Sequence, residues 1–188
     1  MTPRSPLPGA YWFAWLVGVL GVAIEFSFVY WGSTIVGKRT GISSADATLL
    51  ASFFVAGMFT GRMAIGHGLG SGGDQSRVLA AGLAVVLAGV SLAWISTVPA
   101  LSGVGLFLGG LGTAGMWPVG LTLALQAAPK AQLQAAARAT LGSGFAVLIV
   151  PSGLGLASDA VGVVAAWPIT LGLAVAGLIV LAITPRRR

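Results

Sequence analysis

The amino-acid sequence predicts an all-α protein that crosses a membrane six times. Of its 188 residues, 56% are hydrophobic and only 7% are charged, and the mean hydropathy is +0.96. A water-soluble domain carries about 25% charged residues, because its surface must be hydrated. Four acidic and ten basic side chains are too few for that purpose. An apolar solvent must therefore cover most of the surface, and the lipid bilayer is the first partner that the composition predicts.

The first three predicted spans follow a short polar leader, residues 1–10. The run 11–36 is too long for the apolar core of a signal peptide, and no small-residue cleavage site follows it cleanly. The run 46–69 comes after Ser43, Ser44 and Asp46, which are typical residues at helix beginnings. The run 78–97 completes the first three, and each run reaches the length of about 20 residues that a spanning helix needs.

The last three predicted spans cover 101–127, 138–159 and 163–184. Pro99 precedes the first of them, and Pro185 closes the last, at the start of a basic tail, 185–188. The connections between the six runs are too short to hold a separate soluble domain. A membrane β-barrel is rejected, because its strands alternate polar and apolar residues over about ten positions, whereas these runs are longer and continuously apolar.

Basic residues predict the orientation of the six helices. An even number of spans brings both termini to one side, which holds Arg4, Arg77, Lys130, Arg138, Arg186, Arg187 and Arg188. The other side holds Lys38 and Arg39. The positive-inside rule therefore predicts a multi-pass protein of the cell membrane with both termini in the cytoplasm. Several aromatic residues, including Trp94 and Trp167, lie near predicted helix ends, as in an aromatic belt.

The net charge of +6 and the isoelectric point of about 11.3 suit an anionic membrane surface better than nucleic acid, because the bases are sparse and lie between apolar runs. Cysteine is absent and His67 is the single histidine, so neither a metal site nor a cofactor is expected. No G-x-S-x-G, H-E-x-x-H or phosphate-loop motif occurs. The sequence therefore predicts a protein that is not an enzyme.

Glu25 is the most informative residue. An ionisable side chain inside a span costs about 2.5 kcal/mol or more unless it faces protein or water. Glu25 shares one helical face with Gly18, Gly21 and Gly32, so we expect it to point into the helix bundle. Two interpretations stay open: a carboxyl that couples to protons or contacts a cationic substrate, and a buried carboxyl that bonds a neighbouring helix.

Further candidate residues lie on the later spans. Trp117 and Pro118 lie near the centre of the fourth span, where proline removes a backbone hydrogen bond and bends the helix, and Pro151 is expected to do the same in the fifth. Thr122 and Gln126 lie one turn apart below that bend, where they would line a polar path. The remaining candidates are Arg62, expected to hold a gate or reach the lipid headgroups, and Asp159, expected to cap the fifth span structurally.

Two stretches carry a family resemblance. In the first, 57–62 leads to Gly66 and a short loop, 70–75. The second runs from Pro151 to Gly155 and on to Asp159, Gly162 and Trp167. Together with the six spans, these stretches resemble the C-terminal six-helix half of a major facilitator superfamily transporter, over nearly the whole chain.

The first stretch is similar to the cytoplasmic loop motif of that family, G-x-x-x-D-R/K-x-G-R/K-R/K. Gly66 and Gly73 match its glycines, and Arg62 matches the arginine that often precedes it. Gly70 and Ser71 replace the motif's aspartate and the base after it, so two of its charged groups are missing. Gly66 and Gly73 are accordingly expected to have a structural or gating role.

The resemblance implies one half of a secondary transporter that moves a small molecule by alternating access, with substrate between two six-helix halves. The implied partners are a small-molecule substrate and a second six-helix half or a second copy of this chain. Apolar walls with one acid favour proton-coupled efflux of a lipophilic cation over sugar transport, since asparagine is absent. The alternative is a non-transporting membrane scaffold or accessory subunit, or a truncated remnant of a transporter.

Overall fold

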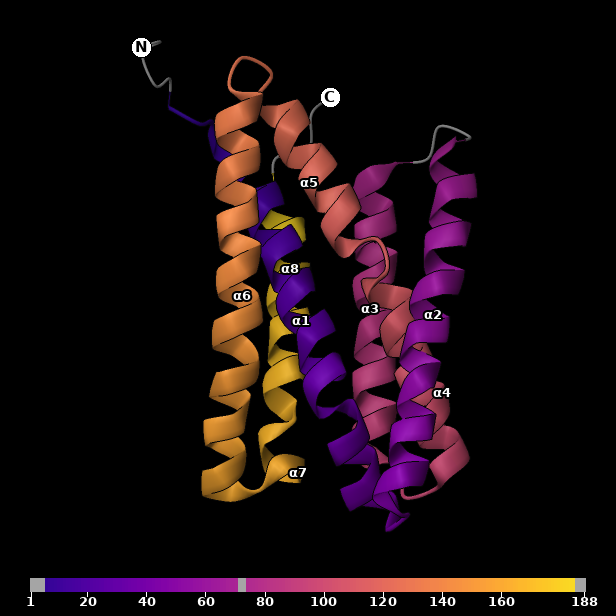
Figure 1. The fold of residues 1–188 in the computed structure, drawn as a ribbon. Coiled ribbons are helices and arrows are strands. Elements are labelled where there is room, and N and C mark those ends of the chain that lie inside the picture. Colours follow the sequence, from indigo (N-terminus) through magenta and orange to yellow (C-terminus); the bar gives the residue numbers. More distant parts are fainter. Residues whose placement is uncertain (1–5, 71–73, 185–188) are drawn as a thin grey trace.

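The computed structural model describes residues 6–70 and 74–184, and this part of the chain is an elongated helical bundle (Figure 1). Helix accounts for 89% of the structure, and no strand occurs among the described residues. The predicted all-α class is therefore confirmed. The helices are α1 (Gly9–Thr40), α2 (Ser44–Gly70), α3 (Gln75–Ile95), α4 (Pro99–Thr113), α5 (Met116–Ala127), α6 (Gln132–Val161), α7 (Val163–Ala166) and α8 (Pro168–Ile183).

Six segments of the described chain are long and apolar enough to cross a bilayer. Four of them are the single helices α1, α2, α3 and α6. The other two are composite: α4 with α5 covers Pro99–Ala127, and α7 with α8 covers Val163–Ile183. The predicted membrane protein with six spanning segments is thus confirmed at this level.

The helices run back and forth between two ends of the bundle (Figure 1). One end, here called the terminal end, holds the start of α1, the last turn of α8, the end of α2, the start of α3 and the connection α5–α6. The opposite end, here called the distal end, holds the connections α1–α2, α3–α4 and α6–α7. Lys38 and Arg39, in the last turn of α1, lie at the distal end. Arg77, near the start of α3, and Lys130, between α5 and α6, lie at the terminal end.

Local signals in the sequence determine several helix ends. At the start of α2, the Ser43 hydroxyl accepts a hydrogen bond from the backbone N–H of Asp46 (3.1 Å) and donates one to its carboxylate (2.7 Å). Asp74 begins α3 in the same way, because its carboxylate accepts from the backbone N–H of Ser76 (2.9 Å). Such caps satisfy N–H groups that have no partner within the helix.

The packing relates the first three spans to the last three. The first span of each group packs against the second and third spans of the other: α1 contacts α6 and α8, and α4 contacts α2 and α3. The two first spans also contact each other through α1, α4 and α5, and the two third spans through α3 and α8. Because each group has three spans, the second group runs in the opposite direction to the first. This pairing of contacts is the one expected of an inverted repeat.

Glycines permit the closest of these contacts, which centre on α4. A methyl group added at Gly112 would lie 2.5 Å from the carbonyl oxygen of Gly82 in α3, and one added at Gly105 would lie 2.6 Å from the backbone nitrogen of Ala93. On the other side of α4, Gly110 meets the backbone of Phe54 in α2. The glycine-rich face expected in the fourth span is therefore a packing face on two sides.

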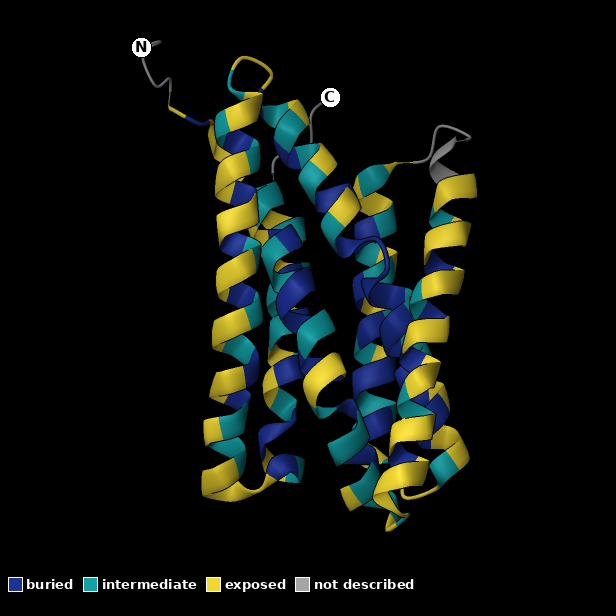
Figure 2. Ribbon diagram, viewed as in Figure 1, coloured by how far each residue is buried: buried dark blue, intermediate teal, exposed yellow. Residues whose placement is uncertain are grey.

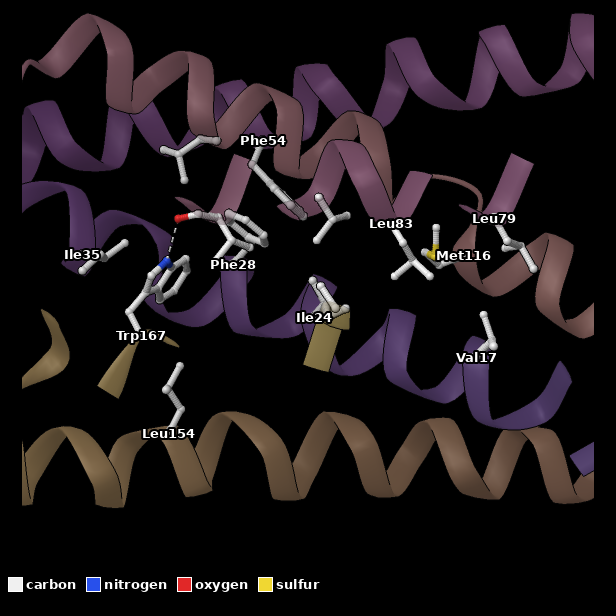
Figure 3. Close-up of a cluster of buried hydrophobic side chains, with 14 of the residues drawn as sticks. Val17, Ile24, Phe28, Ile35, Phe54, Leu79, Leu83, Met116, Leu154 and Trp167 are labelled. Carbon is white, nitrogen blue, oxygen red and sulfur yellow. Dashed lines mark hydrogen bonds between the residues drawn. The ribbon is translucent and has the colours of Figure 1, made fainter. Parts of the chain in front are cut away.

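An aromatic cluster fills the core towards the distal end (Figure 3). Phe28 stacks on Phe54 with ring centroids 5.0 Å apart and meets Trp167 edge-on at 5.3 Å. The indole N–H of Trp167 donates to the carbonyl oxygen of Val90 (3.2 Å), and the side chain is fully buried. The prediction that Trp167 belongs to an interfacial aromatic belt is wrong, because the break before Pro168 turns this residue inward between α1 and α3.

Candidate functional site

Glu25 lies at the centre of α1. It comes 16 residues after Gly9 and 15 before Thr40, which corresponds to about 23 Å from either end of the helix. The observed helix extends beyond the predicted run 11–36, so Glu25 lies nearer the middle than the sequence indicated. The side chain is half-buried. No described side chain donates a hydrogen bond to its carboxyl group.

Glu25 lies between a tightly packed side of α1 and an exposed side of the same helix. One turn before it, Gly21 meets Met116 of α5, and two turns after it, Gly32 would bring an added methyl group to 3.3 Å from Leu106 of α4. One turn after Glu25, Val29 is 54% exposed. Glu25 therefore lies at the border where α1 leaves its contact with the fourth span.

Arg62 is the charged candidate residue of the second span. It is exposed on α2, eight residues before Gly70, or about 12 Å from the terminal end of that helix. The two side chains do not form an ion pair within 4.0 Å. Val55, two turns away from Arg62 along the same side of α2, is 64% exposed. An acid and a base thus occupy neighbouring helices without neutralising each other directly.

The side of the bundle seen in Figure 1, where α1 and α5 lie between α6 and α2, is here called the open face. Figure 2 shows exposed positions along the whole of α2 and α6, whereas α4 is mostly buried. Of the six spans, α2 and α6 are the least buried. A bilayer covers their apolar side chains readily, but it does not solvate a carboxyl group at the centre of α1.

The fourth span is broken beside Glu25's helix. α4 ends at Thr113 and α5 begins at Met116, with Ala114 and Gly115 in a turn between them. Proline has no N–H group and its ring clashes with the carbonyl four residues earlier, which for Pro118 is the carbonyl of Ala114. The break therefore lies one turn before Pro118, close to the bend expected at Trp117 and Pro118. Pro118 itself occupies the first turn of α5, where the missing donor costs little.

This break is buried at a junction of three helices. Ala114 lies 2.6 Å from a methyl group placed at Gly61 of α2, and Met116 lies 2.5 Å from one placed at Gly82 of α3. Met116 also meets Gly21 of α1. Sequence reasoning overlooked Met116 and Gly61. The signal for Gly61 was present, since Gly57 and Gly61 form a small-xxx-small pattern that predicts close helix packing.

The polar residues of α5 point away from Trp117. Trp117 is half-buried in a cluster with Val22 and Ala146, and its ring lies 3.7 Å from a methyl group placed at Gly18. Thr122 and Gln126 are exposed and follow Pro118 at intervals of four residues, on one face of α5. The Thr122 hydroxyl donates to the carbonyl oxygen of Pro118 (2.8 Å). Trp117 and the pair Thr122 and Gln126 therefore do not form one continuous lining.

The other candidate residues lie apart from Glu25. Gly66 is exposed, and a methyl group added there would meet nothing within 4 Å; Gly73 lies outside the described residues. Pro151 is buried within α6, which continues through it without a break, and its carbonyl oxygen accepts from the indole N–H of Trp31 (3.1 Å). Asp159 is exposed in the last turn of α6, and the cap of that helix is Gly162, with φ +83°, instead of Asp159.

Comparison with known protein families and with curated proteins found no match for this chain. The features that define the site are a carboxyl group at the centre of α1, a broken fourth span, and a basic residue, Arg62, on the neighbouring helix α2. A carboxyl group in this position can bind a proton or a cation in turn. No group of three or more potential metal ligands occurs among the described residues.

Proposed function

We propose that the chain is one half of a membrane transporter of the major facilitator type, which moves a small molecule by alternating access. The observation that carries the proposal is Glu25, an acid at the centre of a span that faces neither a hydrogen-bond donor nor a full covering of protein. Such residues are rare within membranes because of their desolvation cost, and they mark ion and substrate pathways.

The inverted relation of the two groups of three spans also supports this proposal, since it is the arrangement found within each six-helix half of such transporters. The broken fourth span supports it further. Discontinuous helices near the midplane commonly form substrate and ion sites, because their interrupted backbone leaves polar groups free. Here Met116, the first residue after the break, lies against Gly21, one turn from Glu25.

In the proposed mechanism, the Glu25 carboxylate binds either a lipophilic cation or a proton. Protonation neutralises the carboxylate and releases the cation on one side of the membrane. Loss of the proton on the other side restores the charge. Exchange of the two ligands would let protons moving down their gradient drive the cation out of the cell, and Arg62 would favour the charged carboxylate when no cation is bound.

The proposed partner is a second six-helix unit on the open face, and a second copy of this chain is the simplest source. Glu25 on α1 and Arg62 on α2 give the helices of this face one acid and one base, so two copies can pair opposite charges. A two-fold symmetric pair would place the acid of each copy towards the base of the other. The proposed location is the cell membrane, with the terminal end in the cytoplasm because of its excess of bases.

Transport by the purified full chain tests the proposal. Vesicles containing the protein are given an imposed pH gradient, acidic inside, and uptake of labelled tetraphenylphosphonium is compared with protein-free vesicles. We expect gradient-driven uptake with the natural chain and its loss, by at least about tenfold, with Glu25→Gln, because the amide cannot carry a negative charge. Asp46→Asn removes an exposed acid near the distal end and should retain uptake.

Absence of uptake would favour the second candidate function, a membrane scaffold or accessory subunit. The exposed flanks of the open face motivate this alternative, since they provide a docking surface without requiring transport. If a panel of lipophilic cations and neutral drugs shows no uptake above protein-free vesicles, transport by this chain is contradicted. If the natural chain and Glu25→Gln take up the cation equally, transport stands and only the proposed role of Glu25 is contradicted.

A further inference from the structure

A hollow of about 390 Å³ lies at the distal end, away from the open face site. Its lining residues come from the ends of α1, α3 and α6 and from α7: Arg39, Trp94, Ile95, Val161, Val164 and Ala165. All of them except Arg39 present apolar surface to it. The indole N–H of Trp94 donates to the carbonyl oxygen of Val164 (2.8 Å), which joins two walls of the hollow.

Arg39 contributes the one charged group of this lining, and its hydrogen bonds are incomplete. Nη2 donates to the carbonyl oxygen of Ile95, the last residue of α3, at 2.7 Å. Nε is buried and has no hydrogen-bond partner. Asp159, two residues before Val161, does not form an ion pair with Arg39 within 4.0 Å. A buried donor without an acceptor is unfavourable, so the guanidinium group lacks an anionic partner within the described chain.

The position and the walls of the hollow indicate the chemistry of that partner. Arg39 is the next-to-last residue of α1, so the guanidinium lies where a spanning helix reaches the lipid headgroups. Its planar set of donors suits two oxygens of a phosphate group. The apolar walls beside it suit the upper part of an acyl chain, and Trp94 is a typical residue at this depth.

We propose that this hollow binds an anionic phospholipid, with Arg39 holding the phosphodiester and the wall formed by Trp94 and Val164 contacting the acyl chain. Nη2 remains on the carbonyl oxygen of Ile95. The site is distinct from Glu25 and does not depend on transport.

Lys38 offers a matched control for Arg39. It is adjacent in the sequence and also positively charged, but it is exposed and lines a separate, more polar hollow with Ser44 and Thr48. Removal of either base changes the net charge equally. Any general attraction between the distal end and an anionic membrane would therefore weaken to the same extent in Arg39→Ala and Lys38→Ala.

Native mass spectrometry of the full chain, with dioleoylphosphatidylglycerol added at defined ratios, measures the binding. We expect lipid affinity to fall about tenfold in Arg39→Ala, because a charge-assisted phosphate contact is lost, and to change less than twofold in Lys38→Ala. Arg39→Lys should recover part of the affinity. Ala165→Phe, which narrows the hollow while keeping Arg39, should also weaken binding, and it serves as a second test if Arg39→Ala does not fold.

Two further ligands separate a lipid from a free phosphate. Dioleoylglycerol lacks the phosphate and should bind equally weakly to all variants. Glycerol phosphate in millimolar excess should not displace phosphatidylglycerol, since it cannot use the apolar walls. The proposal is overturned if Arg39→Ala and Lys38→Ala bind phosphatidylglycerol alike. The assignment of the hollow to a lipid is also overturned if glycerol phosphate displaces phosphatidylglycerol completely.

Discussion

At the scale of single residues, the bundle depends on positions where no side chain fits. Lipid tails are as apolar as leucine, so helices in a membrane associate by close van der Waals contact and need small residues at their interfaces. Gly112 of α4 faces the backbone of Gly82 and Val86 in α3. Gly172 of α8 has the same residue type in a helix, but it is exposed and has open space around it.

Substitution by alanine should lower the Tm at Gly112 but not at Gly172. In Gly112→Ala, the added methyl group would lie 2.5 Å from the Gly82 carbonyl oxygen, so the helices must separate. Overpacking of this kind costs about 1–3 kcal/mol, which lowers the Tm by about 2–10 °C in a protein of this size. Gly172→Ala should leave the Tm unchanged or raise it slightly, because alanine favours helix. Thermal unfolding in detergent, followed by size-exclusion chromatography, measures both; a Tm for Gly112→Ala equal to that of Gly172→Ala would contradict the packing argument.

At the scale of elements, the broken fourth span is the feature that differs most from a simple spanning helix. Two causes act at the same place. Pro118 removes a donor and crowds the carbonyl of Ala114, while Met116 and Ala114 fit against glycines of α1, α2 and α3. Pro151 provides the comparison, since a proline within α6 does not interrupt that helix. Proline alone therefore does not determine where a span breaks.

Pro118→Ala should partly straighten the fourth span, because residue 118 then donates its N–H to Ala114. The chain has no cysteine, so nitroxide labels can be attached at Leu101→Cys and Gln126→Cys, both exposed positions. A straight helix separates positions 25 residues apart by about 38 Å. We expect the labelled distance to increase towards that value in Pro118→Ala and to stay unchanged with Pro151→Ala. No increase would mean that the packing of Met116 and Ala114 holds the break by itself.

At the scale of the whole molecule, the open face is the surface that needs a partner. The exposed side of α8 is apolar and suits lipid, as Val175 and Ile179 illustrate. The helices of the open face combine exposed apolar positions such as Val29 with the charges of Glu25 and Arg62. A second copy would withdraw these charges from lipid and enclose a pathway between two bundles.

Cross-linking in membranes tests this arrangement. Val29→Cys places a thiol one turn from Glu25, and Ile179→Cys places one on α8, with a similar exposure of 54% against 56% for the replaced side chains. Under mild oxidation we expect a disulfide-linked dimer of Val29→Cys and none of Ile179→Cys. Dimers of Ile179→Cys at an equal yield would indicate random collision. The absence of a Val29→Cys dimer would argue that a different six-helix unit covers the face.

Part of the structure could be predicted because hydropathy and helix signals are local. The scarcity of charge and the length of the apolar runs predicted six helical spans, and Ser43 lies at a predicted helix beginning where its side chain satisfies a backbone donor. The intramembrane position of Glu25 also followed from the sequence, because one acid within a long apolar run is conspicuous. These properties depend on the solvent and on neighbours within a few residues.

By itself, the sequence determined the solvent, the helical class, the approximate spans and the presence of one costly acid, since each depends on composition or short-range pattern. Only the tertiary structure decided which residues meet. It buried Trp167 against Val90, set the break at Ala114 and Gly115 among three helices, turned Thr122 away from Trp117, and left Arg39 beside an apolar hollow. These outcomes depend on contacts between segments far apart in the chain, where the rotation of each helix about its axis is chosen by close packing.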